Sequence, residues 1–298
     1  GARLLPTMVE HIKEGRTNGA PELEALVEYP ASALYATDRG LGRYVSAVCM
    51  DRAVAMAREY GIGAVAVRGV AHWGRAHSYA LRAAKDGMVG LCFTNAIVNF
   101  AAWGTSTPTL GNNPFAIGVP GAPPAVLDLA MSQSSVSRVR MAAQVGERVP
   151  LGWGLDAEGQ PTDDPQAIID SGRFLPMGGH KGSGLAFMVE LLTAGLANGL
   201  LCFEQGTLRN PTDTAGGSAK LFIAIRPYGD WLPERLAELV AHLKDAPPAP
   251  EQGEALWPGE GSFRRRQDYE RTGIELPGPL VAELDALAED LGLSLQWA

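Results

Sequence analysis

A glycine-rich segment with one lysine precedes a long apolar run in FLPMGGHKGSGLAFMVELL, residues 174–192. Its glycines would let backbone amides approach a ligand closely. A helix expected to begin near Gly184 would favour an anion at its N-terminus, and Lys181 would add a full positive charge. The segment is not a P-loop, because Lys181 precedes a glycine instead of following one. An anion site and a flexible turn with a solvated lysine both remain open interpretations.

Two histidines follow an expected strand in RGVAHWGRAHSYA, residues 68–80. Ligands of open α/β sheets bind in loops at the carboxyl ends of strands. A histidine in such a loop can act as a general acid or base, because its ordinary pKa lies near neutrality. For His72, which lies before the expected helix, catalysis and a structural role are both open. His77 lies within that helix, where a structural role is favoured.

Three further polar side chains are candidates for ligand contacts. Asn113 lies in the proline-locked loop TLGNNPFAIG, which could orient a carboxylate or form a structural turn. Asp128 ends the strand in VLDLAMSQSS, where it could bond a ribose hydroxyl or cap a helix. Arg138 could pair with a substrate carboxylate through two hydrogen bonds, or simply be solvated.

Several other chemistries find no support in the sequence. There is no GxSxG segment for a hydrolase and no histidine or carboxylate cluster for a metal. The three cysteines are far apart in apolar settings and are expected to be free, buried thiols. A net charge of -8 disfavours binding to nucleic acid. No apolar run approaches membrane-spanning length and no signal-peptide pattern is present, so we expect a cytoplasmic protein without membrane contact.

These residues must be positioned by an alternation of strands and helices that indicates an α/β fold. The patterns predict helices over 3–14, 46–59, 76–86, 184–198 and 233–244 and in the C-terminal tail, and strands over 62–68, 89–95, 115–119, 125–130 and 220–227. Residues 245–261 are rich in proline and glycine and are expected to form a linker or long loop.

Six segments, taken together and in order, resemble the type 2 malate/L-lactate dehydrogenase family of NAD(P)-dependent oxidoreductases. They are VRGVAHWG, GLCFTNAIVNFAAWGTSTPTLGNNPFAIGVP, VLDLAMS, VPLGWGLDAEGQPTDDPQAI, LPMGGHKGSGLAFMVELLTAGLANG and WPGEGSFRRR. The resemblance implies an α/β, non-Rossmann fold with a mixed sheet and a homodimer. It also implies a helical dimerisation region from both termini, residues 1–60 and 250–298, around a cofactor- and substrate-binding domain at 61–249.

The resemblance assigns roles to individual residues. It makes His72 the acid/base residue and places the loop with Asn113 at the border of the active site. Arg138 is a candidate for the substrate carboxylate. The residues that match cofactor contacts are Asp128, Leu129, Ala130, Lys181, Gly182, Pro258, Gly259 and Glu260.

Departures from the family pattern leave the substrate open. Gly1 matches the glycine of a Ser-His-Gly motif, so that motif's histidine is expected before the first residue and the N-terminal part of the helical region is expected to be truncated. The segment around His180 resembles the cyclic-imine reductases, whereas these carry an acidic residue where this chain has Arg138. The leading hypothesis is hydride transfer between NAD or NADP and C2 of a small 2-oxo or 2-hydroxy acid. The alternatives are reduction of a cyclic imine acid and dinucleotide binding without catalysis.

Overall fold

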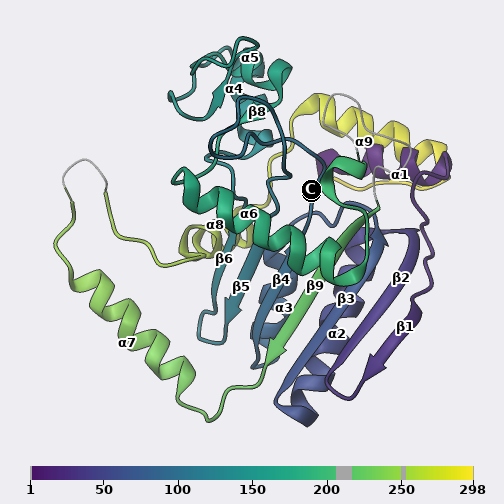
Figure 1. The fold of residues 1–298 in the computed structure, drawn as a ribbon, viewed down its shortest axis with the longest axis vertical. Helices are drawn as coiled ribbons and strands as arrows, with labels where there is room; N and C mark the ends of the chain where they lie inside the picture. The colour runs from purple at the N-terminus through teal and green to yellow at the C-terminus, as the bar shows by residue number, and fades with distance from the viewer. Residues whose placement is uncertain (1, 206–216, 250–252, 298) are drawn as a thin grey trace.

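The computed structural model describes residues 2–205, 217–249 and 253–297. Its centre is a seven-stranded mixed sheet with the order β1-β2-β3-β9-β4-β5-β6 (Figure 1). The strands are β1 (Glu24–Tyr29), β2 (Ser32–Gly40), β3 (Ile62–Val70), β4 (Val89–Thr94), β5 (Phe115–Val119), β6 (Ala125–Leu129) and β9 (Ser218–Ile225). A small separate sheet pairs β7 (Gly154–Leu155) with β8 (Arg173–Phe174).

Strand direction brings several loops to one edge of the large sheet. β2 and β3 pair in parallel, and the other neighbouring pairs are antiparallel. β3, β4 and β6 therefore run in the same direction, and the segments that follow them leave from the same edge. Residues on these three segments, including His72 and Asp128, can contribute to one site.

Helices cover both faces of this sheet (Figure 1). α2 (Gly42–Tyr60) and α3 (His77–Lys85) pack on one face, and the π-helical segment η2 (Leu191–Gly195), which continues α6 (His180–Glu190), packs on the other. Successive side chains of β9 therefore point to opposite faces of the sheet and are buried on both. Phe222 belongs to the core under α2 and α3, and Leu221 belongs to the core under η2.

The remaining helices lie outside these layers. α4 (Val136–Val145) and α5 (Pro165–Ser171) form a small lobe with β7 and β8, with a core of its own. α1 (Leu5–Lys13), preceded by the short η1 (Ala2–Leu4), contacts α9 (Gly278–Asp290). The others are η3 (Cys202–Gln205), α7 (Leu232–Asp245) and α8 (Glu260–Thr272). In the described part of the chain, no helix combines the length and apolarity needed to cross a bilayer.

The structure confirms the expected α/β class and the elements predicted from hydrophobic patterning, with shifted boundaries. One shift affects the site: α6 begins at His180, four residues before the predicted start near Gly184. Helices α4, α5 and α8 and the short strands β7 and β8 were not predicted. Residues 250–252 of the loop expected over 245–261 lie outside the described residues, and α8 begins at Glu260, before the expected end of that loop. The three cysteines are free and buried, as expected. The domain division stays a prediction, although β1 and β2, within its helical region 1–60, are strands of the large sheet.

Candidate functional site

Asp128, at the end of β6, connects three segments of the site. Its Oδ2 accepts a hydrogen bond of 2.9 Å from the amide of His77, the first residue of α3, and lies 3.8 Å from Nε of Arg75. The carboxylate thus caps α3 from another element, which is the helix-cap role left open by the sequence. Burial raises the pKa of Asp128, and the His77 amide and Arg75 oppose this shift. Arg75 also donates to Ser262 Oγ of α8 at 3.1 Å.

His72 lies on the loop that also carries Arg75, two residues beyond the end of β3. The amide of Gly74 donates to its Nδ1 at 3.3 Å, which leaves the proton of the neutral ring on Nε2. The ring retains solvent contact, yet the protein atoms around it make burial the largest cause of a lowered pKa. The positive charges of Lys220 and Arg43 lower this pKa further. His72 is therefore a neutral imidazole at neutral pH, and its Nε2–H has no hydrogen-bond partner among the described residues.

Lys220 is a buried residue near the site that the sequence patterns did not indicate. It lies in β9 with 1% of its surface exposed, and its Nζ donates to Ser218 Oγ at 2.6 Å. Burial lowers the pKa of Lys220 to about 7. The sequence contained a signal, since Lys220 shares the strand parity of Phe222 and therefore points into the core beneath α2. Which groups it would meet there depends on the tertiary fold.

Lys181 is exposed in the first turn of α6, and no ion pair of its ammonium appears among the described residues. The backbone amides around it are already used: Lys181 donates to Gly178 O, Gly182 to Met177 O and Ser183 to Gly179 O. The helix amides are therefore less available to an anion than the sequence analysis expected. The charge at this helix start comes from the lysine side chain.

Gly182 supports the site through packing. A Cβ at this position would lie 2.4 Å from Met177 O and 2.9 Å from Met131 O. Met177 also donates its amide to Met131 O at 2.9 Å, and Met131 follows the end of β6. Only glycine lets α6 begin this close to β6, so Gly182 fixes where Lys181 lies relative to Asp128.

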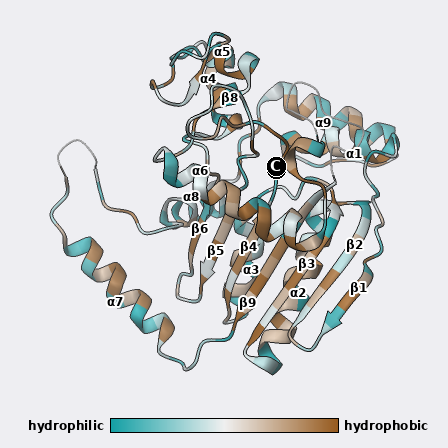
Figure 2. Cartoon of the chain, viewed as in Figure 1, coloured by the Kyte–Doolittle hydropathy of each residue, from teal (hydrophilic) through white to brown (hydrophobic). Residues whose placement is uncertain are grey.

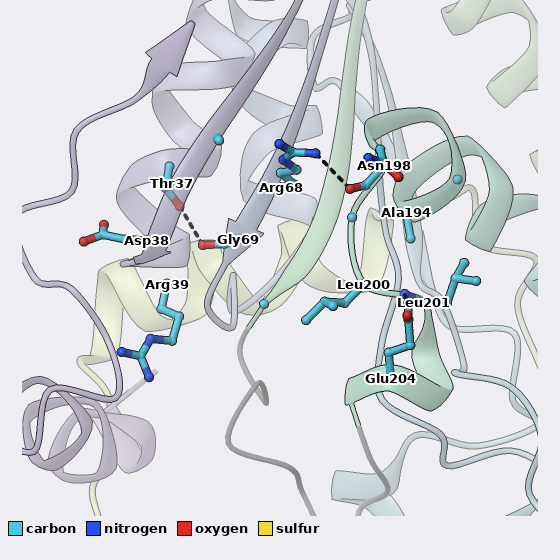
Figure 3. Close-up of a pocket in the computed structure, with 14 residues that line it drawn as sticks. Thr37, Asp38, Arg39, Arg68, Gly69, Ala194, Asn198, Leu200, Leu201 and Glu204 are labelled. Carbon is cyan, nitrogen blue, oxygen red and sulfur yellow. Dashed lines mark hydrogen bonds between the residues drawn. The ribbon is translucent and has the colours of Figure 1, made fainter. Parts of the chain in front are cut away.

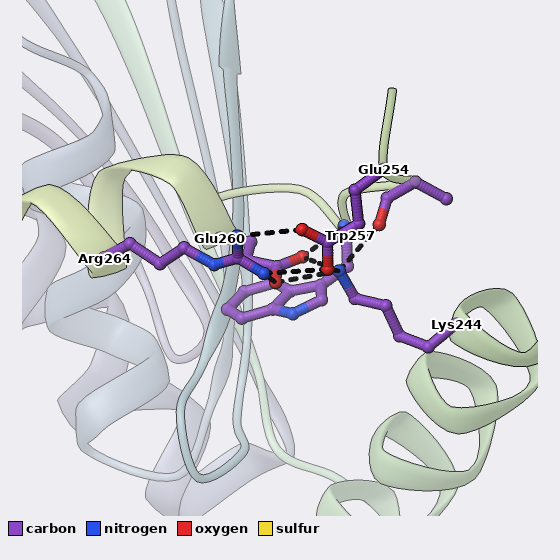
Figure 4. Close-up of polar contacts among 6 residues, drawn as sticks. Lys244, Glu254, Trp257, Glu260 and Arg264 are labelled. Carbon is purple, nitrogen blue, oxygen red and sulfur yellow. Dashed lines mark hydrogen bonds and ion pairs between the residues drawn. The ribbon is translucent and has the colours of Figure 1, made fainter. Parts of the chain in front are cut away.

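The segment 258–260 contacts the opposite end of β6. Pro258 O accepts a hydrogen bond of 2.9 Å from the amide of Val126, and Gly259, with φ of 97°, packs against the same residue. Glu260 points into a cluster of ion pairs with Lys244 at 2.8 Å and with Arg264 (Figure 4). Burial opposes ionisation of Glu260, but hydrogen bonds from Lys244, the Trp257 amide and Arg264 outweigh it and lower its pKa. Its carboxylate therefore holds α8 in place.

Asn113 is fully buried, and its side chain is already bonded. Its Oδ1 accepts from the Ala96 amide at 3.0 Å, and its Nδ2 donates to Ala186 O and Glu190 Oε2, both at 2.8 Å. The predicted substrate contact thus finds no free group on this side chain. Asn113 instead joins the start of β5 to α6.

The segment after β6 contains an unsatisfied hydroxyl and the start of α4. Ser134 Oγ is buried and has no hydrogen-bond partner among the described residues. Arg138, in the first turn of α4, is exposed, and its guanidinium carbon lies 4.9 Å from the ring centroid of Trp153. This stacking fixes the Arg138 side chain in the small lobe and leaves its N–H groups able to meet a carboxylate.

A cavity of about 760 Å³ lies beside this site, between the ends of β2 and β3 and the segment from η2 to η3 (Figure 3). Arg68 closes one side by donating to Asn198 O at 2.9 Å, and Thr37 Oγ donates to Gly69 O at 2.6 Å. None of the site residues predicted from the sequence lines it. We therefore place the candidate site around His72 and β6.

The structure connects most of the predicted residues through β6. His72 and Asp128 are joined by the loop 71–77, Lys181 and Gly182 reach β6 through Met131, and Pro258 and Gly259 bond to Val126. Leu129 and Ala130 complete the end of the same strand and are partly exposed. Gly1, matched to the Ser-His-Gly motif, lies outside the described residues. Within the described residues, no group of three or more histidine, cysteine or acidic side chains could hold a metal ion.

Comparison with known proteins gives one consistent family. A family model described as malate/L-lactate dehydrogenase matches residues 1–285. The chain is 35% identical over 293 residues to a (2R)-3-sulfolactate dehydrogenase (NADP(+)) of Chromohalobacter salexigens, covering 97% of this chain and 85% of that protein. It is 34% identical over 258 residues to a Delta(1)-pyrroline-2-carboxylate/Delta(1)-piperideine-2-carboxylate reductase of Pseudomonas putida, covering 85% and 73% respectively.

The fold is also shared with solved structures. Malate dehydrogenase from Entamoeba histolytica superposes with a TM-score of 0.92 at 27% identity, covering all of this chain and 87% of that one. The similarity therefore extends over the sheet, the helices and the loops that carry the site.

Proposed function

The chain belongs to the malate/L-lactate dehydrogenase family, and from this premise we propose that it transfers a hydride between NAD or NADP and C2 of a small 2-oxo or 2-hydroxy acid. The observation that carries this proposal is the family match over residues 1–285. The structure supports the proposal through the position of three segments. His72, the end of β6 and the start of α6 lie at one edge of the sheet, which places an acid/base residue and the cationic Lys181 on the same side.

The residues around β6 fit a nicotinamide dinucleotide. Ser134 supplies a buried hydroxyl that lacks a partner in the described structure, and Lys181 supplies an ammonium without an ion pair. Asp128, Leu129 and Ala130 would line the cofactor from the strand, Lys181 would meet a phosphate, and Gly182, Pro258 and Gly259 would shape the site through backbone packing. Glu260 would act through its hold on α8. When bound, the cofactor supplies the hydride that adds to C2.

His72 would provide the proton for the same step. In reduction, a protonated His72 gives its Nε2 proton to the C2 oxygen as that oxygen gains negative charge, and the imidazole becomes neutral. In oxidation, the neutral imidazole takes the hydroxyl proton. Exchange at Nε2 requires Nδ1 to carry the other ring proton, so the Gly74 amide, which donates to Nδ1 at 3.3 Å in this structure, must release Nδ1 in the reacting complex.

Arg138 is the candidate contact for the substrate carboxylate, since its guanidinium can form two parallel hydrogen bonds with it. Asn113 would act indirectly, by holding the loop at the start of β5. A cyclic imine acid is the second candidate substrate, favoured by the 34% identity to the pyrroline/piperideine-carboxylate reductase. A dinucleotide-binding protein without turnover is the remaining alternative.

We further propose a homodimer that uses the outer face of α6 and η2. Apolar side chains on this face are exposed, and the segment is brown over much of its length in Figure 2. They are Leu185, Phe187, Met188, Leu191, Leu192 and Leu196. A contiguous apolar surface of this kind marks an interaction site. Light scattering should show a dimer that Phe187→Asp with Leu191→Asp converts to a monomer, while Leu151→Asp does not. A monomeric parent protein would contradict the proposal.

The assignment is tested by oxidation of NADH or NADPH in the presence of pyruvate, oxaloacetate, 3-sulfopyruvate and cyclic imine acids. Turnover of a 2-oxo acid with higher kcat/KM than any imine supports the leading proposal. Higher kcat/KM with an imine supports the second candidate. Dinucleotide binding without turnover of any of them would leave only the non-catalytic alternative.

A further inference from the structure

Lys220 is a buried lysine with few partners. A lysine is almost never fully buried unless it is paired, because removing its charge from water is costly. In the described structure its only hydrogen bond goes to Ser218 Oγ, and no carboxylate forms an ion pair with it. A buried lysine stabilised only by a hydroxyl and an aromatic ring, with no carboxylate partner among the described residues, points to a functional reason for the ammonium.

The position of the Lys220 ammonium suggests what the buried charge does. Nζ lies 5.7 Å from the ring centroid of Trp73, the residue after His72. Ser218 Oγ, which accepts from Lys220, donates in turn to Val70 O at 2.8 Å, at the end of β3. Lys220 therefore lies beneath the loop that begins at Val70 and carries His72.

This loop is rigid where it meets the core. Trp73 is 4% exposed and stacks on Tyr79 with a centroid distance of 5.6 Å, and the Tyr79 hydroxyl donates to Trp73 O. Phe222, from the same strand as Lys220, contacts both rings edge-on. These contacts hold the backbone next to His72 close to the ammonium of Lys220.

We propose that Lys220 is a positioning residue for the acid/base step, whose buried charge acts on His72 from beneath its loop and keeps the imidazole neutral. This rests on the proposed role of His72. Burial of His72 acts in the same direction as Lys220. An isolated lysine side chain in water could not do this, because solvent would screen its charge.

Other groups around this pair come from each packed element. Arg43 of α2 adds a second positive charge near His72, and its guanidinium lies over Gly74. Cys49 of α2 faces Lys220, and burial raises the pKa of this thiol to about 12, so it stays uncharged. Tyr79 of α3 is likewise neutral, since burial raises its pKa to about 12. Arg43 and Lys220 therefore supply the charge that acts on His72.

The test is an NMR titration of the His72 ring in the whole protein, assigned with His72→Asn. Replacement by Lys220→Gln or Lys220→Met removes the charge, which should raise the pKa of His72 by roughly 0.5 to 1 unit. Lys220→Arg keeps the charge and should leave this pKa at or below its original value.

The stability of the two neutral variants distinguishes this electrostatic role of Lys220 from a structural one. A neutral side chain is easier to bury than a charged one, so both neutral variants should melt no lower than the parent protein at pH 7. An unchanged pKa of His72 in a folded neutral variant would overturn the proposal, and so would failure of both neutral variants to fold. Since the titration needs no turnover, this result is independent of whether the protein reduces a 2-oxo acid.

Discussion

His72 should give the reaction a characteristic pH dependence. Burial, Lys220 and Arg43 lower its pKa from 6.5 because they disfavour the imidazolium. Reduction needs the protonated ring, so kcat/KM for the 2-oxo acid should fall as pH rises through this lowered pKa. Oxidation needs the neutral ring, so its kcat/KM should fall as pH drops through the same value. Initial rates in both directions between about pH 5 and 8 measure this.

Replacement of the histidine provides the matched control. His72→Asn should lower kcat/KM by roughly 10²- to 10⁴-fold and remove the pH dependence. His242→Asn, on the exposed surface of α7, should change neither. Retention of the same pH profile in His72→Asn would show that another group moves the proton.

Lys220 should also make stability depend on pH. Its pKa is about 7 in the folded protein and 10.5 when solvated, so between these values the unfolded chain binds more protons. The free energy of unfolding should therefore rise with pH across this window, relative to Lys220→Met, with a slope approaching about 1.4 kcal/mol per pH unit. Urea unfolding of both proteins from pH 7 to 9.5 measures the difference between their free energies of unfolding. The buried thiols contribute nearly equally to both proteins, so their contribution largely cancels. A difference that does not change with pH would contradict the lowered pKa of Lys220 in the folded protein.

The role of a single residue could be predicted from the sequence only where residues next to it in the chain determine its environment. His72 and Lys181 follow a strand and a glycine cluster, respectively, and this local context suggested chemistry. Lys220 depends on contacts with Trp73 and Ser218 that only the tertiary fold creates. Asn113 looked like a ligand contact because its loop is polar, yet Glu190, distant in sequence, occupies its amide.

At the level of elements, the start of α6 depends on one glycine. Gly182→Ala should destabilise the protein by about 1–3 kcal/mol, because the new Cβ would meet the carbonyl oxygens of Met177 and Met131. Gly184→Ala is the matched control in the same helix, with no atom within 4 Å of its Cβ, and should stabilise by about 0.5–1 kcal/mol. Thermal unfolding compares the two variants. Equal stability of both would mean that α6 does not begin against Met131.

Helix boundaries and polar helices were the features predicted least well from the sequence. Glycines at 178–184 suggested a late helix start, but the contacts of Gly182 with β6 allow the helix to begin at His180. α8 is polar around most of its surface and gives no hydrophobic period, since Glu260 is its one buried residue. The buried strands and the amphipathic helices were recovered, because their patterns reflect burial directly.

At the scale of the whole molecule, segments far apart in sequence meet around β6, and Lys181 contributes an ammonium that forms no ion pair with the described residues. Lys181→Ala should weaken dinucleotide binding by roughly ten- to a hundred-fold while slowing the bound reaction little, because it removes a charge-assisted contact to phosphate. Lys85→Ala, on an exposed lysine in the last turn of α3, is the control. Calorimetry with NADH and NADPH gives the Kd values. Unchanged affinity in Lys181→Ala would remove this residue from the cofactor site.

The most direct test follows the hydride itself. The protein is incubated with NADH or NADPH carrying deuterium at both C4 positions of the nicotinamide and with the 2-oxo acid that supports the fastest turnover, and the product is analysed by mass spectrometry and NMR. Our account predicts a 2-hydroxy acid with one deuterium at C2, formed far more slowly by His72→Asn. Failure of every 2-oxo acid to oxidise either cofactor, or a product without deuterium at C2, would contradict it.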